Sequence, residues 1–137
     1  MKLPSSSDLA KLPHLFQVRY ALYAATKVAH FNTLPEAATC LKVVEAYLDG
    51  KASKEDCRVA ATAAYSDTAA YAAAAYAAAY AAYAAYYDAY DAYAADAAAG
   101  AAHSKQTKAM LVADLRRYYE ELLNFDAISE SYLLHKL

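Results

Sequence analysis

Two aspartates one helical turn apart are the residues of this sequence whose types and spacing could do chemistry. They stand in the segment YDAYDAY, as Asp88 and Asp91. Side chains three residues apart share a helix face, so the two carboxylates could share a cation or a proton. No histidine at ligand spacing and no third acid on the same face accompanies them. We therefore expect no metal site, no cofactor and no acid–base catalysis, in a protein that is not an enzyme.

The histidines and cysteines add no catalytic arrangement. His30 and His103 stand near a predicted helix end and a predicted helix start, where local hydrogen bonding is the ordinary role. Cys57 lies near a helix N-terminus, which can lower a thiol pKa, but no candidate base stands at a meaningful spacing. Cys40 belongs to a different predicted helix, so neither a disulfide framework nor a zinc site is indicated. We interpret both cysteines as structural thiols.

The tyrosine pattern of residues 65–96 is the feature that could act by binding. Between Ala69 and Asp96 the chain reads AAYAAAAYAAAYAAYAAYYDAYDAYAAD, with no Leu, Ile, Val, Lys, Arg, Glu or Gly. On a wheel of 100° per residue, all the tyrosines but Tyr71 fall within an arc of about 140°, and the aspartates lie opposite among alanines. The tyrosines in this arc are Tyr65, Tyr76, Tyr80, Tyr83, Tyr86, Tyr87, Tyr90 and Tyr93. The pattern is an amphipathic helix in which rings replace aliphatic side chains and methyl groups replace most charges.

Two interpretations of this stripe remain open. The rings could be a core or half-buried packing surface, with the hydroxyls reaching water while the alanines let a second helix approach closely. Alternatively, part of the stripe is a recognition face, because tyrosine offers a large, rigid contact area at little cost in side-chain entropy. The candidate binding residues are those of the densest patch: Tyr83, Tyr86, Tyr87, Asp88, Tyr90, Asp91 and Tyr93.

A helical hairpin is predicted to precede this patch. Residues 1–12, rich in serine and proline, read as an irregular lead-in. Residues 13–50 form the hairpin: Pro13 begins its first helix, the start signal TLPE at residues 33–36 begins its second, and Gly50 ends it.

The Ala/Tyr-rich region follows as one helix or a helix pair over residues 53–100. A single helix of that length would be about 70 Å long, so we expect a break or kink near Asp67, where Ser, Asp and Thr compete for backbone hydrogen bonds. Residues 104–137 supply the C-terminal helices, the last of them short and over residues 128–135. The predicted N-caps are Ser53 and Ser104. The expected fold is a single all-α domain over residues 1–137, a bundle of four to five helices.

Composition and charge limit the classes of partner that this chain could bind. With 13 basic and 15 acidic residues and a net charge of −2, the chain gives no reason to expect nucleic-acid binding. The uncharged window from Thr68 to Tyr87 lacks the Leu, Ile, Phe and Val that drive membrane insertion. The N-terminal residues lack a signal-peptide pattern, so we expect a cytoplasmic protein. The Ala/Tyr helix offers more apolar surface than short helices can cover, which favours a homo-oligomer, a dimer in the simplest case.

Residues 41–64, LKVVEAYLDGKASKEDCRVAATAA, resemble a known family. They are similar to the alanine-rich immunity proteins of bacterial and phage-borne toxin systems. The shared features are a helix ending in a YLDGKAS-like turn, a long Ala-rich helix with aromatic residues at intervals, and a basic helix like KQTKAMLVADLRR. Together they cover residues 41–117. This chain departs from the family in its tyrosine content and in having no tryptophan. The resemblance implies a neutralising binder and brings no catalytic residues.

We therefore expect a non-enzymatic binding protein, an immunity-type inhibitor or phage counter-defence protein that occludes a toxin or a host defence protein. A first alternative is a sponge that sequesters a small aromatic or nucleotide signal between tyrosines of neighbouring helices. Its phosphate contacts would come from Lys105, Lys108, Arg116 and Arg117. A second alternative is a structural helical module.

Overall fold

The computed structural model describes residues 2–31, 34–66, 73–87, 89–102 and 104–125. These residues are all-helical, which confirms the predicted fold class, and they form more helices than the four to five expected. The elements are α1 (Ser6–Leu9), α2 (His14–Lys27), the 3₁₀ turn η1 (Ala29–Phe31), α3 (Pro35–Leu48), α4 (Lys54–Ser66), α5 (Ala73–Ala84), α6 (Tyr90–Gly100) and α7 (Lys105–Leu123). The helix expected over residues 128–135 lies outside the described residues.

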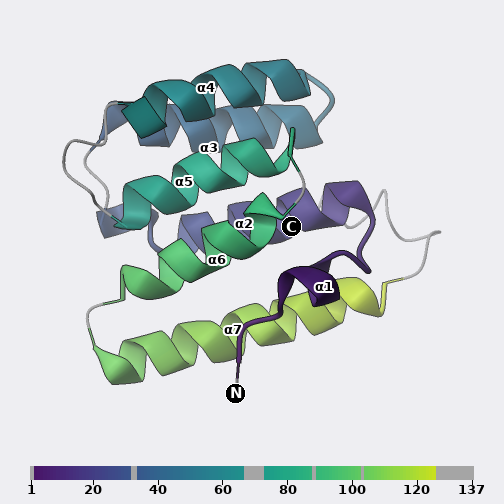
Figure 1. The fold of residues 1–137 in the computed structure, drawn as a ribbon, viewed down its shortest axis with the longest axis vertical. Coiled ribbons are helices and arrows are strands. Elements are labelled where there is room, and N and C mark those ends of the chain that lie inside the picture. The colour runs from purple at the N-terminus through teal and green to yellow at the C-terminus, as the bar shows by residue number, and fades with distance from the viewer. Residues whose placement is uncertain (1, 32–33, 67–72, 88, 103, 126–137) are drawn as a thin grey trace.

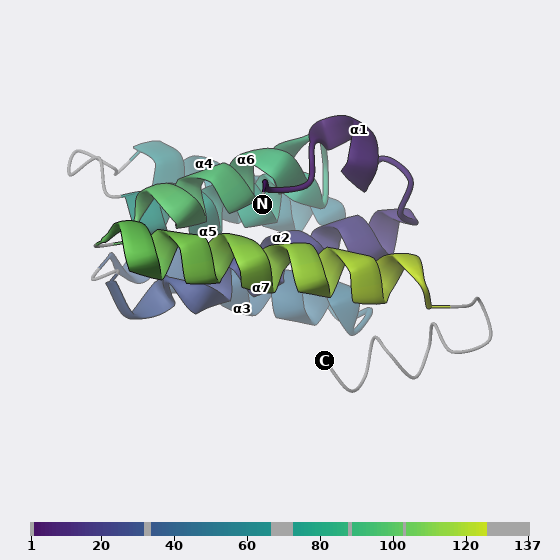
Figure 2. The same ribbon diagram turned by 90° about the horizontal axis from the view of Figure 1, so that it is seen from below.

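The helices pack in layers around α5. In Figure 1, α4, α5 and α6 lie side by side in front of α3 and α2, and α7 runs along the edge opposite α4. α5 contacts α2, α3, α4 and α6, which makes it the central element. Figure 2 shows α1 at the end of the bundle where α7 finishes. There the Tyr119 hydroxyl donates to the Asp8 carbonyl oxygen at 3.1 Å.

The predicted helix start and stop signals are present. The Ser53 hydroxyl accepts the Asp56 N–H at 3.0 Å, and the Ser104 hydroxyl accepts the Thr107 N–H at 3.1 Å, so both predicted N-caps are confirmed. Pro13 is the N-cap of α2, and Pro35 is the first residue of α3. Gly50 has a φ of +77°, the left-handed conformation that ends a helix and favours glycine.

The short helix α1 contradicts the irregular lead-in expected for residues 1–12. A capping box forms it: the Ser5 hydroxyl accepts the Asp8 N–H, and the Asp8 carboxylate accepts the Ser5 N–H at 3.0 Å. The spacing Ser-x-x-Asp is the sequence signal that could have revealed it. The helix delivers Leu9 to the core, where its side chain is fully buried.

Alanine forms the buried side of the Ala/Tyr segment. Eight alanines of α5 are buried, and the alanines at the centre of α6 join them. The α5 alanines divide between two apolar clusters, one containing Phe16, Tyr20 and Leu115, the other containing Val44 and Cys57. In α5 the alanines rather than the rings are therefore the buried component, because α5 is enclosed by four helices and only methyl-sized side chains fit between them.

The segment 53–100 is divided among three helices, where one helix or a pair was expected. The break expected near Asp67 lies outside the described residues; α4 ends at Ser66 and α5 begins at Ala73. A further break separates α5 from α6, and in it Ala89 adopts the left-handed conformation with a φ of +73°. The Tyr83 carbonyl oxygen accepts the N–H groups of Tyr86 and Tyr87, which closes the last turn. No glycine or proline marks this break in the sequence.

Enlarging a buried alanine of α5 should destabilise the fold. Ala82 is fully buried between helices, so Ala82→Leu forces side chains off their rotamers and should lower the free energy of unfolding by about 1–3 kcal/mol. Ala63→Leu, at an exposed position of α4, is the matched control and should be nearly neutral. Denaturant unfolding of both variants measures the difference, and equal stabilities would contradict an alanine core.

Relieving the left-handed alanine should stabilise the fold. Glycine adopts a positive φ without a Cβ clash, so Ala89→Gly should raise the free energy of unfolding by about 0.5–1 kcal/mol. Ala92→Gly, inside α6, should instead lower it by about 1 kcal/mol. Thermal melts of the two variants should therefore shift in opposite directions, and a shared decrease would place Ala89 in an ordinary helical conformation.

Candidate functional site

The tyrosines of α4, α5 and α6 gather in one continuous surface, which we call the tyrosine face. It contains Tyr65 of α4, Tyr76, Tyr80 and Tyr83 of α5, Tyr86 and Tyr87 of the turn, and Tyr90 and Tyr93 of α6. Each of these rings lies 4.8–6.4 Å, centroid to centroid, from at least one other ring of the group. They are the same residues that the sequence placed on one arc.

Antiparallel helix packing assembles this face. Tyr80 lies 5.9 Å from Tyr93 and Tyr83 lies 5.1 Å from Tyr90, so α6 runs back along α5. On the other side of α5, the Thr62 hydroxyl hydrogen bonds with the Tyr83 hydroxyl at 3.1 Å, which ties α4 to α5. Three short helices therefore present together the rings that a single long helix would have spread along its length.

The face is open to solvent. The exposed fractions of its outer residues are 46% for Tyr65, 40% for Tyr86, 44% for Tyr87 and 50% for Tyr93, and the other rings are half-buried. None of the eight is a core residue, although alanines beside them in the sequence are fully buried. Of the two sequence interpretations, the geometry favours a surface available for contact over a packed core.

Two neighbouring hollows interrupt the face. The first, of 340 Å³, is lined by rings alone: Tyr65, Tyr80, Tyr83, Tyr87, Tyr90 and Tyr93. The second, of 370 Å³, shares Tyr80 and Tyr93 with it and adds Ala73, Tyr76, Asp96 and Ala97. Both volumes lie at the small end of the range of about 300–1,000 Å³ typical of ligand sites. Partial burial is the main cause that raises the pKa of Tyr80 and Tyr90, and the neighbouring phenols raise it further. These hydroxyls are therefore neutral at physiological pH.

Two cations border the face at Tyr86. Lys54 Nζ lies 5.6 Å from the centroid of the Tyr86 ring, and Arg58 Cζ lies 6.0 Å from it. Arg58 also donates from Nε to the Glu55 carboxylate at 2.9 Å, an ion pair within α4 that lowers the pKa of Glu55. Lys54 and Arg58 are not among the binding residues predicted from the sequence, because their place beside Tyr86 depends on how α4 packs.

The predicted binding residue Asp91 does not join the tyrosine face. Asp91 is only 3% exposed and lies beside Ser6, Gln17 and Ala89, and its carboxylate accepts the Ala92 N–H at 2.8 Å. Asp88 lies outside the described residues. The structure therefore brings together Tyr83, Tyr86, Tyr87, Tyr90 and Tyr93, and turns Asp91 inward toward α1 and α2.

The four basic residues proposed for phosphate contact line neither hollow. Arg116 pairs with Asp8 at 3.6 Å, and Arg117 pairs with Asp114 at 2.6 Å, so both take part in ion pairs. Lys105 and Lys108 are exposed in the first turns of α7. Burial raises the pKa of Asp96, and the charge of Lys108 acts against that rise.

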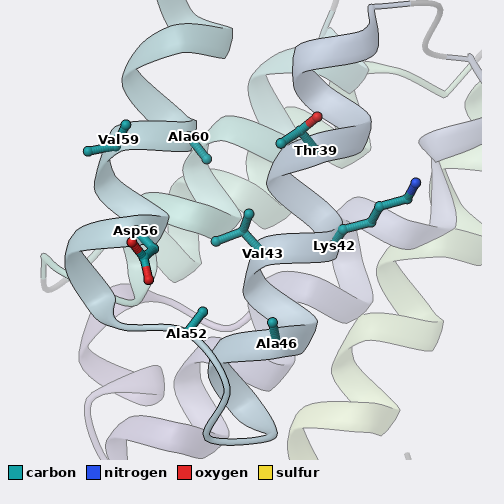
Figure 3. Close-up of a pocket in the computed structure, with 8 residues that line it drawn as sticks. All are labelled: Thr39, Lys42, Val43, Ala46, Ala52, Asp56, Val59 and Ala60. Carbon is teal, nitrogen blue, oxygen red and sulfur yellow. The ribbon is translucent and has the colours of Figure 1, made fainter.

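A separate groove between α3 and α4 carries little chemistry. Figure 3 shows its floor of small apolar side chains, with Lys42 extending away from α4. The groove measures 510 Å³ and is lined by Thr39, Lys42, Val43, Ala46, Ala52, Asp56, Val59 and Ala60. Its one carboxylate, Asp56, already accepts the Ser53 N–H at 2.9 Å.

Comparisons with protein-family models, curated proteins and solved structures find no match to this chain. The resemblance to immunity proteins therefore stays a hypothesis. Among the residues the structure describes, no group of three or more His, Cys, Asp or Glu side chains could hold a metal ion. In the same part of the chain, no helix has the length and apolar character needed to cross a membrane.

The two thiols lie in the core between α3 and α4. Burial raises the pKa of Cys40 to about 12, with the nearby Cys57 adding to the shift, and burial raises the pKa of Cys57 to about 11, with Asp56 adding to it. The Cys40 Sγ–H donates to the Ala60 carbonyl oxygen at 3.2 Å. Despite its position near the start of α4, Cys57 thus has the properties of a packing residue.

We expect both thiols to be unreactive in the folded protein. At pH 8 the folded thiols hold their protons, so labelling by a disulfide reagent should be at least about 100-fold slower than in guanidinium chloride. The folded pKa values of the thiols exceed the usual value of 9.0, so keeping the thiols protonated stabilises the folded state. This contribution to the free energy of unfolding is complete below pH 9 and is lost as the pH rises through the folded pKa values. Rapid labelling of the folded protein would contradict the buried placement.

Proposed function

We propose that this chain is a non-enzymatic binding protein that occludes a protein target through the tyrosine face. In this proposal the target is a toxin or a host defence protein, and the chain acts in the cytoplasm as an immunity-type inhibitor or a phage counter-defence protein. The observation that carries the proposal is the partial exposure of eight tyrosines, each beside another ring of the group, on helices whose alanines are buried. Tyrosine-rich, partly exposed surfaces are characteristic of binding hot spots.

The stability of the scaffold supports this use of the face. The rings rest on α4, α5 and α6, which are fixed by buried alanines and by the Thr62–Tyr83 hydrogen bond. Each ring is also held by its neighbours, so little side-chain entropy remains to be lost when a partner binds. The residues that bind and the residues that stabilise the fold are largely different, so contact with a target need not disturb the core.

A second candidate function is the sequestration of a small aromatic ligand. The 340 Å³ hollow lined by tyrosines favours it, since a base could stack there on an aromatic ring. Lys54 and Arg58, which border the face at Tyr86, would then contact a phosphate in place of the four residues of α7 expected from the sequence. Stacking on a tyrosine ring does not distinguish one base from another, so the charged groups of the ligand that Lys54 and Arg58 contact would determine its class.

A homo-oligomer was expected because the Ala/Tyr segment offers more apolar surface than short helices can cover. The α5 alanines are covered by α2, α3, α4 and α6 of the same chain, so the surface left for an oligomer is that of the rings. A dimer would then form through the exposed rings and would compete with the target. Light scattering at micromolar concentration measures the mass directly.

Truncating one exposed ring should weaken target binding without unfolding the protein. Tyr87 is 44% exposed, so we expect Tyr87→Ala to weaken binding by about 2 kcal/mol, as hot-spot truncations do, while the free energy of unfolding changes by less than about 0.5 kcal/mol. Met110→Ala, at a 66% exposed apolar residue of α7, is the control and should leave binding unchanged.

The measurement is capture from a lysate of the cells that carry the gene, with the wild type and both variants immobilised in parallel. A stoichiometric protein bound by the wild type and by Met110→Ala, and lost from Tyr87→Ala, supports the proposal. Heat denaturation of the purified protein, followed by chromatography of the supernatant, tests for a released nucleotide. Release of a nucleotide with no captured protein would favour sequestration. If Tyr87→Ala still binds the ligand that the wild type binds, the tyrosine face is ruled out as the binding site.

A further inference from the structure

The hollow at the α6 edge of the tyrosine face differs from its neighbour in containing a carboxylate. Its walls are the rings of Tyr76, Tyr80 and Tyr93, and Asp96 stands among them one turn after Tyr93 on α6. We call it the Asp96 hollow. Tyr80 and Tyr93 also line the neighbouring 340 Å³ hollow, so a partner side chain in the Asp96 hollow would be continuous with a partner surface on the tyrosine face.

The charge in this hollow is not neutralised by an ion pair within the described residues. Asp96 is exposed, and no described cation lies within salt-bridge distance of it. Lys108 of α7 is the described cation whose charge reaches it, without a direct contact. The carboxylate is negatively charged and the face of an aromatic ring carries a partial negative charge, so the hollow as a whole attracts a cation and repels an anion.

We propose that the Asp96 hollow receives an arginine side chain of the protein target. This inference rests on the proposed function. A guanidinium group stacks on aromatic faces and donates two parallel hydrogen bonds to a carboxylate, and rings beside an acid offer both partners in one place. At the far edge of the same face, Lys54 and Arg58 of the chain itself already lie 5.6 and 6.0 Å from a tyrosine ring centroid, within the range of cation–π attraction.

Other ligand classes fit the hollow less well. A phosphate or carboxylate group would meet Asp96 and would be repelled. An apolar side chain would leave the Asp96 carboxylate partly desolvated without a hydrogen-bond donor. An ammonium group would gain the attraction of the rings but could not form the planar, paired contact with the carboxylate that a guanidinium forms.

The test uses short peptides and the whole chain. The protein carries isotope-labelled tyrosine rings and is titrated with acetyl-Gly-Arg-Gly-amide, or with the same peptide in which citrulline, the uncharged isostere, replaces arginine. We expect the arginine peptide to shift the ring signals of Tyr76, Tyr80 and Tyr93 in a saturable way, and the citrulline peptide to bind about tenfold more weakly. Equal binding of the two peptides, or the absence of any shift, would overturn the inference.

Matched variants separate a specific site from general charge attraction. Asp96→Asn should reduce the preference for arginine over citrulline to about twofold or less, whereas Asp49→Asn, which makes the same charge change at the exposed C-cap of α3, should preserve it. Tyr93→Phe keeps the ring and should retain binding, whereas Tyr93→Leu should weaken it. Melting temperatures confirm that each variant is folded. An unchanged preference in Asp96→Asn would exclude this carboxylate as the recognition group.

Failure of this inference can be told apart from failure of the proposed function. If Tyr87→Ala abolishes target capture while Asp96→Asn leaves both capture and peptide preference intact, the tyrosine face binds its target without an arginine in this hollow. If the wild type captures no protein yet distinguishes arginine from citrulline, the hollow is a cation site and the target-occlusion proposal is wrong.

Discussion

Close packing of helices through alanine is the constraint on which the rest of the structure depends. α5 is enclosed by α2, α3, α4 and α6, and its alanines are buried against them. Methyl-sized side chains allow helix axes to approach to the near end of the usual spacing of about 8–10 Å. Each alanine removes little apolar area from water, so the packing depends on many small dispersion contacts. A helix enclosed in this way has no interior room for a tyrosine ring, and the rings must lie on its open side.

The grouping of the rings follows from the same constraint. α4, α5 and α6 lie side by side, and because each buries its alanines inward, each turns its tyrosines to the same outer side. The rings then cover one another's edges and leave hollows between them. The two described carboxylates of α6 lie on different sides of the helix. Asp91 faces the core toward α1 and α2, and Asp96 lies at the edge of the tyrosine face.

The sequence predicted which tyrosines share a surface but not which way that surface faces. Helical periodicity identified the eight tyrosines, because residues on one side of each short helix stay on one side when the helices fold back on each other. It could not show that alanine would be the buried component, since that depends on how many helices surround α5. Ser53, Ser104 and Gly50 were predictable because caps are local. The turn at Ala89 was not, because no glycine or proline marks it, and Asp91 lies inward because it shares a side of α6 with the buried Ala94, Ala95 and Ala98.

The separation of alanine from tyrosine has a consequence for how this protein can change over evolutionary time. Substitutions that alter the outer rings would leave the interior contacts of α5 in place, whereas substitutions that enlarge the alanines would disturb several helices at once. One scaffold could thus diversify its outer surface by single-residue steps while its interior stays constrained, since function resides in sites carried by a fold rather than in the fold itself. Related chains would then keep their alanines in register and differ most where this one has tyrosine.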